Sequence, residues 1–191
     1  MTTGDGGRVI AGTARGIRLA APGPGTRPLG DRVKQTLFAI LEPDLPGSDV
    51  LDLFAGSGAA GIEALSRGAA RATFVERDRG AAAVIAANLE RAHVADRARV
   101  VRADAIAWLG GADAVRDAPF QVVVLDPPYA ETGLLASALE AVAPLVPPGG
   151  RVVAKHFWRD PPPAEVGLLA SERERRFGET TLTFYRRQED R

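Results

Sequence analysis

The chain has 191 residues, 46% of them hydrophobic, and its 24 basic and 24 acidic residues give a formal net charge of zero at pH 7. These values predict one domain with at most a small appendage and a sizeable core, and they argue against a nonspecific polyanion binder. The lack of cysteine excludes disulfides and thiolate sites, and two histidines are too few for a metal cluster, so we expect no metal. No apolar run has membrane length and no signal peptide precedes the chain, so we expect a soluble, cytoplasmic protein.

Residues 1–47 predict a small N-terminal lobe. Residues 1–7 are rich in Gly and Thr, and we expect them to be disordered. Two short β-like pieces, residues 8–10 and 17–19, predict a hairpin, and a Pro/Gly loop follows it. A helix is predicted from Asp31, whose side chain can cap it. One face of this helix is apolar and holds Val33, Leu37, Ile40 and Leu41.

This lobe is basic, although the whole chain is neutral. Six positive charges stand between residues 8 and 34, against Asp31 alone, which gives a local net charge of +5. The positive side chains are Arg8, Arg15, Arg18, Arg27, Arg32 and Lys34. Such a segment can be an ordinary solvated face or a contact surface for nucleic acid, and its charge alone leaves both open.

From residue 48 to residue 191, strands and helices alternate, which predicts an α/β domain with a mostly parallel sheet. The predicted parallel strands are residues 49–54, 72–76, 99–103, 120–125 and 150–154. The predicted helices are residues 58–67, 79–92, 106–109 and 134–142, with a loop or frayed helix over 110–119. Two polar-alternating stretches, 166–175 and 180–187, add an antiparallel hairpin at the sheet edge and bring the sheet to seven strands.

A glycine-rich loop follows the first of these strands and opens a helix. The segment Asp52–Gly58 (DLFAGSG) has glycines where the backbone must turn tightly or approach a ligand. With Gly61 it also matches G-x-G-x-x-G, and Glu76 follows about twenty residues on, so a nicotinamide dinucleotide site must be considered. A purely structural turn is the other alternative. A nucleoside triphosphate site is excluded, because no Lys-Ser or Lys-Thr follows the glycines.

Acidic residues stand at the ends of four successive predicted strands. They are Asp52, Glu76, Asp104 and Asp126. This pattern resembles the S-adenosylmethionine-dependent methyltransferases of the Rossmann-like class, and the resemblance implies that fold and that cofactor. Dinucleotide enzymes give no reason for the Asp-Pro-Pro-Tyr sequence at residues 126–129.

The four apolar residues Val122–Leu125 predict a strand buried on both faces, and it ends abruptly at this Asp-Pro-Pro-Tyr elbow. The exocyclic amine of a purine is a poor nucleophile, because its lone pair is delocalised into the ring. Asp126 and the carbonyl of Pro127 can each accept one N–H and so direct the lone pair at a methyl donor. Pro128 helps to fix that carbonyl, and Tyr129 offers a stacking face worth about 1–3 kcal/mol.

The elbow predicts amine methylation but does not identify the substrate. Asp-Pro-Pro-Tyr occurs both in enzymes that act on adenine in DNA and in enzymes that act on guanine in RNA. The N-terminal motifs around Arg8–Gly12, Arg15-Gly16 and Asp31–Phe38, with residues 63–68 and 176–182, resemble the RsmD family. That family methylates the exocyclic nitrogen of one guanine in 16S ribosomal RNA. Two departures are Leu29-Gly30, where Thr-Thr or a close variant is common, and Gln35, where Glu is common.

The resemblance assigns roles to three groups of residues. The implied cofactor residues are Asp52, Phe54, Ala55, Gly56, Ser57, Gly58, Glu76, Arg77, Asp104 and Ala105. The implied catalytic residues are Asp126, Pro127, Pro128 and Tyr129. The candidates for RNA phosphate contacts are Arg15, Arg18, Arg27, Arg32 and Lys34. The expected partner is 16S RNA, in a small-subunit particle, and the expected state is a monomer.

Two alternatives stay open beside an RNA guanine-N2 methyltransferase. One is a DNA adenine-N6 methyltransferase, although the chain has little room for a domain that reads DNA sequence. The other is a noncatalytic RNA-binding factor with the same fold. His156 follows the fifth strand and is expected to be a satisfied surface histidine, while Trp108 and Trp158 are more typical of a partial core and receive no role.

Overall fold

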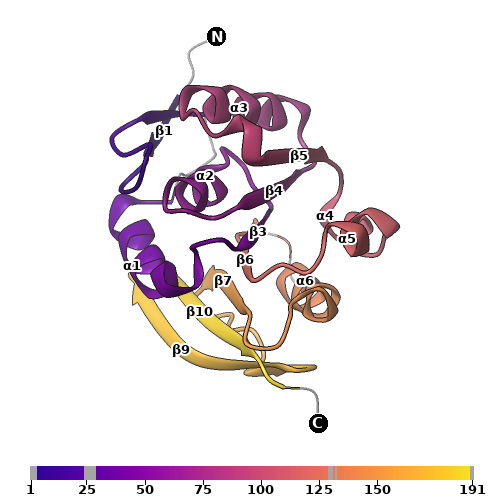
Figure 1. The fold of residues 1–191 in the computed structure, drawn as a ribbon. Helices are drawn as coiled ribbons and strands as arrows, with labels where there is room; N and C mark the ends of the chain where they lie inside the picture. Colours follow the sequence, from indigo (N-terminus) through magenta and orange to yellow (C-terminus); the bar gives the residue numbers. More distant parts are fainter. Residues whose placement is uncertain (1–3, 24–28, 129–130, 132, 190–191) are drawn as a thin grey trace.

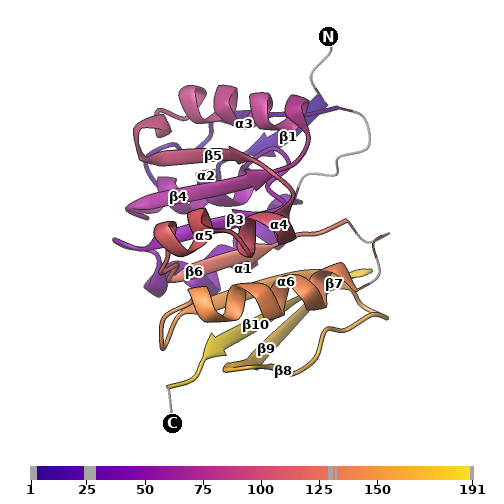
Figure 2. The same ribbon diagram turned by 90° about the vertical axis from the view of Figure 1, so that its right-hand side faces the viewer.

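The computed structural model describes residues 4–23, 29–128, 131 and 133–189, and its centre is an eight-stranded sheet (Figure 1). The strand order is β5-β4-β3-β6-β7-β10-β9-β8, and Figure 2 shows the strands stacked in this order. Strands β3 to β7 pair in parallel, and β10, β9 and β8 continue the sheet antiparallel. The bounds are β3 Asp49–Leu53, β4 Arg71–Glu76, β5 Ala98–Arg102, β6 Val122–Leu125, β7 Arg151–Phe157, β8 Glu165–Val166, β9 Leu169–Phe177 and β10 Thr180–Arg187. The predicted Rossmann-like fold is confirmed.

Helices cover both faces of the sheet (Figure 1). One face carries α1 (Asp31–Leu41), α2 (Ala59–Ser66) and α3 (Arg79–Arg91), and the other carries α4, α5 and α6. The second set spans Ala105–Leu109, Ala112–Asp117 and Leu134–Val142. Short 3₁₀ turns occupy Glu42–Asp44, Ala95–Arg97 and Ala143–Leu145. Among the described residues, no helix has both the length and the apolar composition that crossing a bilayer requires.

The apolar side chains of the strands alternate between two core clusters, as the pleat of a sheet requires. On β6, Val122 and Val124 join the cluster under α1, α2 and α3, while Val123 and Leu125 join the cluster under α4 and α6. All four are buried, which confirms a strand covered on both faces. Two details differ from the sequence prediction: β8 adds an eighth strand of two residues, and α5 forms inside the stretch left as loop or frayed helix.

An N-terminal hairpin packs beside this domain, formed by β1 (Gly4–Arg8) and β2 (Arg18–Ala21). The predicted disorder is therefore wrong for the described part of residues 1–7. Pairing with β2 orders this segment, and a Cβ at Gly6 would lie 2.5 Å from the carbonyl oxygen of Ala20. The glycines that suggested disorder instead permit this close approach.

Helix α1 begins where the sequence predicts, but Asp31 does not cap it. The N-cap residue is Gly30, and no side chain makes a cap hydrogen bond there. The Asp31 carboxylate instead accepts a hydrogen bond from Arg8 Nε at 3.1 Å, so it joins the helix to the hairpin.

The hairpin is fixed to α2 by the buried side chains of Glu63 and Ser66. The Glu63 carboxylate accepts from the backbone N–H groups of Ile10 at 2.8 Å and Ala11 at 3.0 Å. Ser66 Oγ donates to the carbonyl of Ala11 at 2.6 Å. A Cβ at Gly12 would lie 1.8 Å from the carbonyl oxygen of Ser66, so only glycine fits there. The predicted N-terminal lobe thus shares its core with the larger domain.

Replacing Glu63 with Ala is expected to lower the free energy of unfolding by about 3 kcal/mol, measured by urea denaturation. The change leaves two partly buried N–H groups without their acceptor and also removes the ion pair that Arg67 Nε makes with Glu63 at 2.8 Å. The matched control is Glu90→Ala, because Glu90 is an exposed glutamate on α3. Equal denaturation midpoints for the two variants would contradict this role for Glu63.

Candidate active site

A cavity of about 800 Å³ opens at the carboxyl ends of the parallel strands. This is the edge at which open α/β sheets bind ligands. The predicted cofactor residues that line it are Asp52, Phe54, Ala55, Gly56, Ser57, Glu76, Arg77, Asp104 and Ala105. Asp126, Pro127 and Pro128 line the same cavity, together with Leu29 and Val33 from the N-terminal lobe. The fold therefore brings the predicted cofactor and catalytic residues to one place. Gly58, the last residue of the loop, is not among the described lining residues.

The glycine loop has a backbone that ordinary residues rarely adopt. Phe54, Gly56 and Gly58 have φ values of 64°, 56° and 76°, all in the left-handed region. For Phe54 this conformation is costly and signals a constrained loop. A Cβ at Gly58 would lie 3.1 Å from Ile85 Cγ2, so the glycine lets α2 pack closely on α3. The loop is thus held in one shape around the cavity.

Two carboxylates accept from backbone N–H groups in this loop and in the helix that follows it. Glu76 accepts from the N–H of Gly56 at 2.9 Å through Oε2 and from the N–H of Asp78 at 2.9 Å through Oε1. Each oxygen keeps a second lone pair with which it can accept from a ligand hydroxyl. Asp52 is buried and accepts from the N–H of Gly61 at 2.8 Å. Burial raises the pKa of Asp52 to about 8.

Asn88 is a site residue that sequence analysis missed. Its buried amide accepts from the N–H of Ala20 at 2.8 Å and donates to the carbonyls of Ala20 and Ser57, both at 2.9 Å. One side chain on α3 thus joins the N-terminal hairpin to the glycine loop. Only the fold could show this contact, because Asn88 lies 68 residues from Ala20.

Asp104 stands two residues after β5 and caps the next helix, accepting from the N–H of Ala107 at 3.0 Å. Asp104 is exposed on the rim of the cavity, and its contact with an adenine amine stays a prediction. Arg77 lies on the same rim and forms an ion pair with Glu131 at 2.6 Å. This pair joins the loop after β4 to the segment after the Asp-Pro-Pro-Tyr elbow.

Asp126 and Lys155 form an ion pair inside the cavity, with Lys155 Nζ 2.6 Å from Asp126 Oδ1. Burial raises the pKa of the Asp126 carboxyl, and the adjacent Lys155 ammonium opposes that rise. Lys155 was missed by sequence analysis. The strand pairing could have indicated it: Leu125 of β6 pairs with Ala154 of β7, so the residues that follow them, Asp126 and Lys155, are neighbours. Pro127 is buried beside this pair, and Pro128 is exposed.

The charges of the cavity lining are strongly unbalanced. Among the described residues of the lining, six are acidic (Asp52, Glu76, Asp78, Asp104, Asp126 and Glu131) and two are basic (Arg77 and Lys155), a formal excess of four negative charges. The cavity therefore favours a ligand that carries positive charge.

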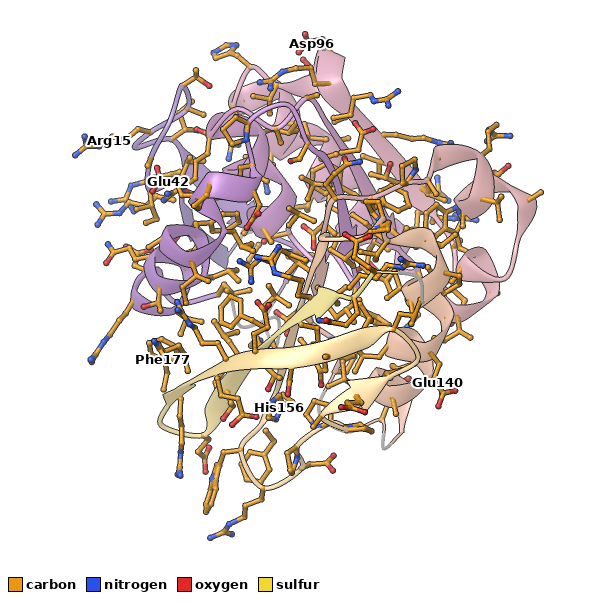
Figure 3. The ribbon with its side chains drawn as sticks, turned by 60° about the horizontal axis from the view of Figure 1, so that its bottom comes forward. Arg15, Glu42, Asp96, Glu140, His156 and Phe177 are labelled. Carbon is orange, nitrogen blue, oxygen red and sulfur yellow. The ribbon has the colours of Figure 1, made fainter. Side chains whose placement is uncertain are left out.

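The predicted RNA-contact residues have different surroundings. Arg15, Arg18 and Arg32 are exposed, and Figure 3 shows Arg15 projecting from the hairpin. Lys34 is only 1% exposed and its ammonium donates to the carbonyl of Arg8, while burial lowers its pKa. Lys34 therefore holds the backbone of the hairpin and, contrary to the sequence prediction, is not placed to contact a phosphate. Arg27 and the predicted catalytic Tyr129 lie outside the described residues.

Two residues that the sequence left without a role are explained by the core. His156 is buried rather than at the surface, and its Nδ1 and Nε2 lie 2.9 Å from the carbonyl oxygen of Phe157 and from Thr183 Oγ1. Trp108 is a buried residue of α4 that packs with Phe120 in the core cluster on that face of the sheet. Neither residue lines the cavity.

Comparison with known proteins gives a consistent picture. A family model described as conserved hypothetical protein 95 matches residues 7–186. The Escherichia coli protein named ribosomal RNA small subunit methyltransferase D is 44% identical over 133 residues, which span 69% of this chain but only 64% of that protein. The Bacillus subtilis protein YlbH is 45% identical over 68% of this chain and 70% of its own. The solved structure of Escherichia coli yhhF is 34% identical, with a TM-score of 0.83 over 98% of this chain and 100% of that one.

Replacing Lys155 with Met is expected to raise the pKa of the Asp126 carboxyl further, because burial then acts without the opposing ammonium. Asp126 would then carry its charge only at higher pH. A pH titration of the carboxyl carbon by ¹³C NMR measures this pKa. Lys155→Arg retains the positive charge and is expected to change the value much less. The same Asp126 pKa in the Met variant and the native protein would show that Lys155 does not control its ionisation.

Proposed function

The chain belongs to the RsmD family, and we propose that it transfers a methyl group from S-adenosylmethionine to the exocyclic N2 amine of a guanine in 16S ribosomal RNA. The observation that carries this proposal is the shared cavity. It joins a constrained glycine loop and Glu76 to the Asp126–Pro127 elbow. The relative's name supports small-subunit ribosomal RNA as substrate, and the family resemblance of the sequence motifs supports the guanine amine.

The residues of the cavity fit S-adenosylmethionine, which supplies an electrophilic methyl group and carries a sulfonium and an ammonium. The excess of acidic side chains in the lining complements these two positive charges. Glu76 is held by two backbone N–H groups in an orientation that lets it accept from the ribose hydroxyls. The loop at Phe54–Gly58 is assigned to the methionine part, and Asp104 with Ala105 to the adenine.

The target amine is assigned to the elbow at the end of β6. Lys155 occupies Oδ1 of Asp126 and favours the ionised carboxylate, so Oδ2 can accept one N–H of the amine. The carbonyl of Pro127 can accept the other N–H. Two acceptors in fixed directions localise the lone pair of the nitrogen and align it with the methyl group. The proton that the amine loses leaves through Asp126 or to water.

The basic N-terminal lobe is the proposed RNA-contact surface, through the exposed Arg15, Arg18 and Arg32. Residues 1–47 would then position the RNA, and residues 48–191 would perform the transfer. A guanine inside a helix is stacked and paired, so the target is a loop base or a base that swings into the cavity. We further propose that the substrate is an assembled small-subunit particle, and that the chain acts as a monomer in the cytoplasm.

Incubation with labelled S-adenosylmethionine and small-subunit particles that lack the modification is expected to label one guanine as N2-methylguanine, identified by nuclease digestion and mass spectrometry. Asp126→Asn should lower the rate by about 100-fold or more, since it removes a charged acceptor at the amine. Glu140→Gln, an exposed change on α6, serves as the control. Label on the N6 amine of adenine in DNA, or no transfer at all, would overturn the proposal.

A further inference from the structure

An aromatic and arginine cluster lies just outside the cavity, at the carboxyl end of β7. The Arg176 guanidinium carbon is 3.9 Å from the ring centroid of Trp158, and that of Arg159 is 4.6 Å from it. Phe157 supports the indole, with ring centroids 6.2 Å apart. The labels of His156 and Phe177 in Figure 3 mark this end of β7 and β9. Two cationic groups are thus held on one half-buried ring.

Hydrogen bonds fix this cluster to the turn between β9 and β10. Arg176 Nε donates to the carbonyl of Gly178 at 2.8 Å. The backbone N–H of Trp158 donates to the carbonyl of Glu179 at 3.0 Å. Stacking on Trp158 and the hydrogen bond from Nε therefore set the orientation of the Arg176 guanidinium. Because this side chain is already ordered, less of its conformational entropy is lost when a ligand binds.

The charges of Arg159 and Arg176 have no acidic partner in the described part of the chain, where no carboxylate oxygen lies within 4.0 Å of either guanidinium. This differs from the other end of these strands, where Arg151 of β7 and Arg186 of β10 both pair with Glu172 of β9. The acidic side chains closest in sequence, Asp160, Glu174 and Glu179, are exposed. Two oriented positive charges without a partner fit an anionic ligand.

The strand order places the cluster on the side of the cavity assigned to the target amine. Phe157 pairs with Thr180 in the sheet, and Thr180 lines the cavity. Asp126 ends β6, the neighbour of β7, whereas Glu76 ends β4, on the other side of β3. An RNA strand that delivers a base to Asp126 would therefore pass this end of β7.

We propose that Arg159 and Arg176, held by Trp158, bind phosphates of the RNA strand that carries the target nucleotide. The planar fork of a guanidinium matches two phosphate oxygens, and the indole keeps both forks at fixed positions. This inference rests on the proposed function and extends its RNA surface. The N-terminal arginines and this cluster would contact the RNA on two sides of the cavity.

The experiment measures binding of the full chain to a fluorescein-labelled single-stranded RNA of about 20 nucleotides, by anisotropy across a salt series. The double variant Arg159→Gln/Arg176→Gln is expected to bind about tenfold more weakly or worse, with a log–log salt slope shallower by about 1.4, the value for two phosphate contacts. Trp158→Leu keeps both charges but frees them, and should give an intermediate loss. Arg116→Gln is the control, because Arg116 is exposed on α5 at the opposite edge of the sheet.

Several outcomes would overturn the inference. If the double variant shows the affinity and the salt slope of the native chain, the cluster does not bind RNA. If it loses affinity for small-subunit particles but neither for the labelled RNA nor for protein-free 16S RNA, the partner is a protein of the particle. Methyl transfer by the native chain separates the two proposals: transfer with an unaffected double variant removes only this surface, whereas absence of both RNA binding and transfer removes the proposed function as well.

Discussion

The parallel register of strands β3 to β7 is the constraint on which the site depends. Leu53 of β3 lies level with Val75 on one side and Leu125 on the other, and Leu125 lies level with Ala154. The loops after these strands therefore start at the same edge and share one cavity. Both faces of these strands are buried, so a shift of one residue would exchange side chains between the two core clusters and displace the polar residues that follow the strands from the cavity.

The N-terminal lobe depends on the same scaffold through α2. Two motifs that resemble the RsmD family, one at residues 8–12 and one at residues 63–68, form the two sides of one joint, since Glu63 and Ser66 bind the backbone of Ile10 and Ala11. Part of the family pattern is therefore explained by assembly of the lobe rather than by direct contact with RNA.

The sequence predicted what depends on local pattern. The bounds of α6, the buried strand Val122–Leu125 and the order of strands and helices follow from periodicity, turn residues and the right-handed crossover rule. It could not predict features that depend on distant partners. Pairing with β2 orders the strand Gly4–Arg8, and the buried ammonium of Lys34 donates to the carbonyl of Arg8. Lys155 contacts Asp126 only because β6 pairs with β7. In each case the decisive neighbour is remote in the chain.

We assign the cofactor to the strands on one side of the cavity and the target amine to β6 and β7, which divides the cavity into two parts. Calorimetric titration of S-adenosylmethionine into Glu76→Ala and Asp126→Ala variants tests this assignment most directly. We expect Glu76→Ala to weaken cofactor binding by about tenfold or more, because a charge-assisted pair of hydrogen bonds is lost. Asp126→Ala should change the affinity by less than about threefold while methyl transfer is lost. Equal weakening of cofactor binding in both variants would contradict the division.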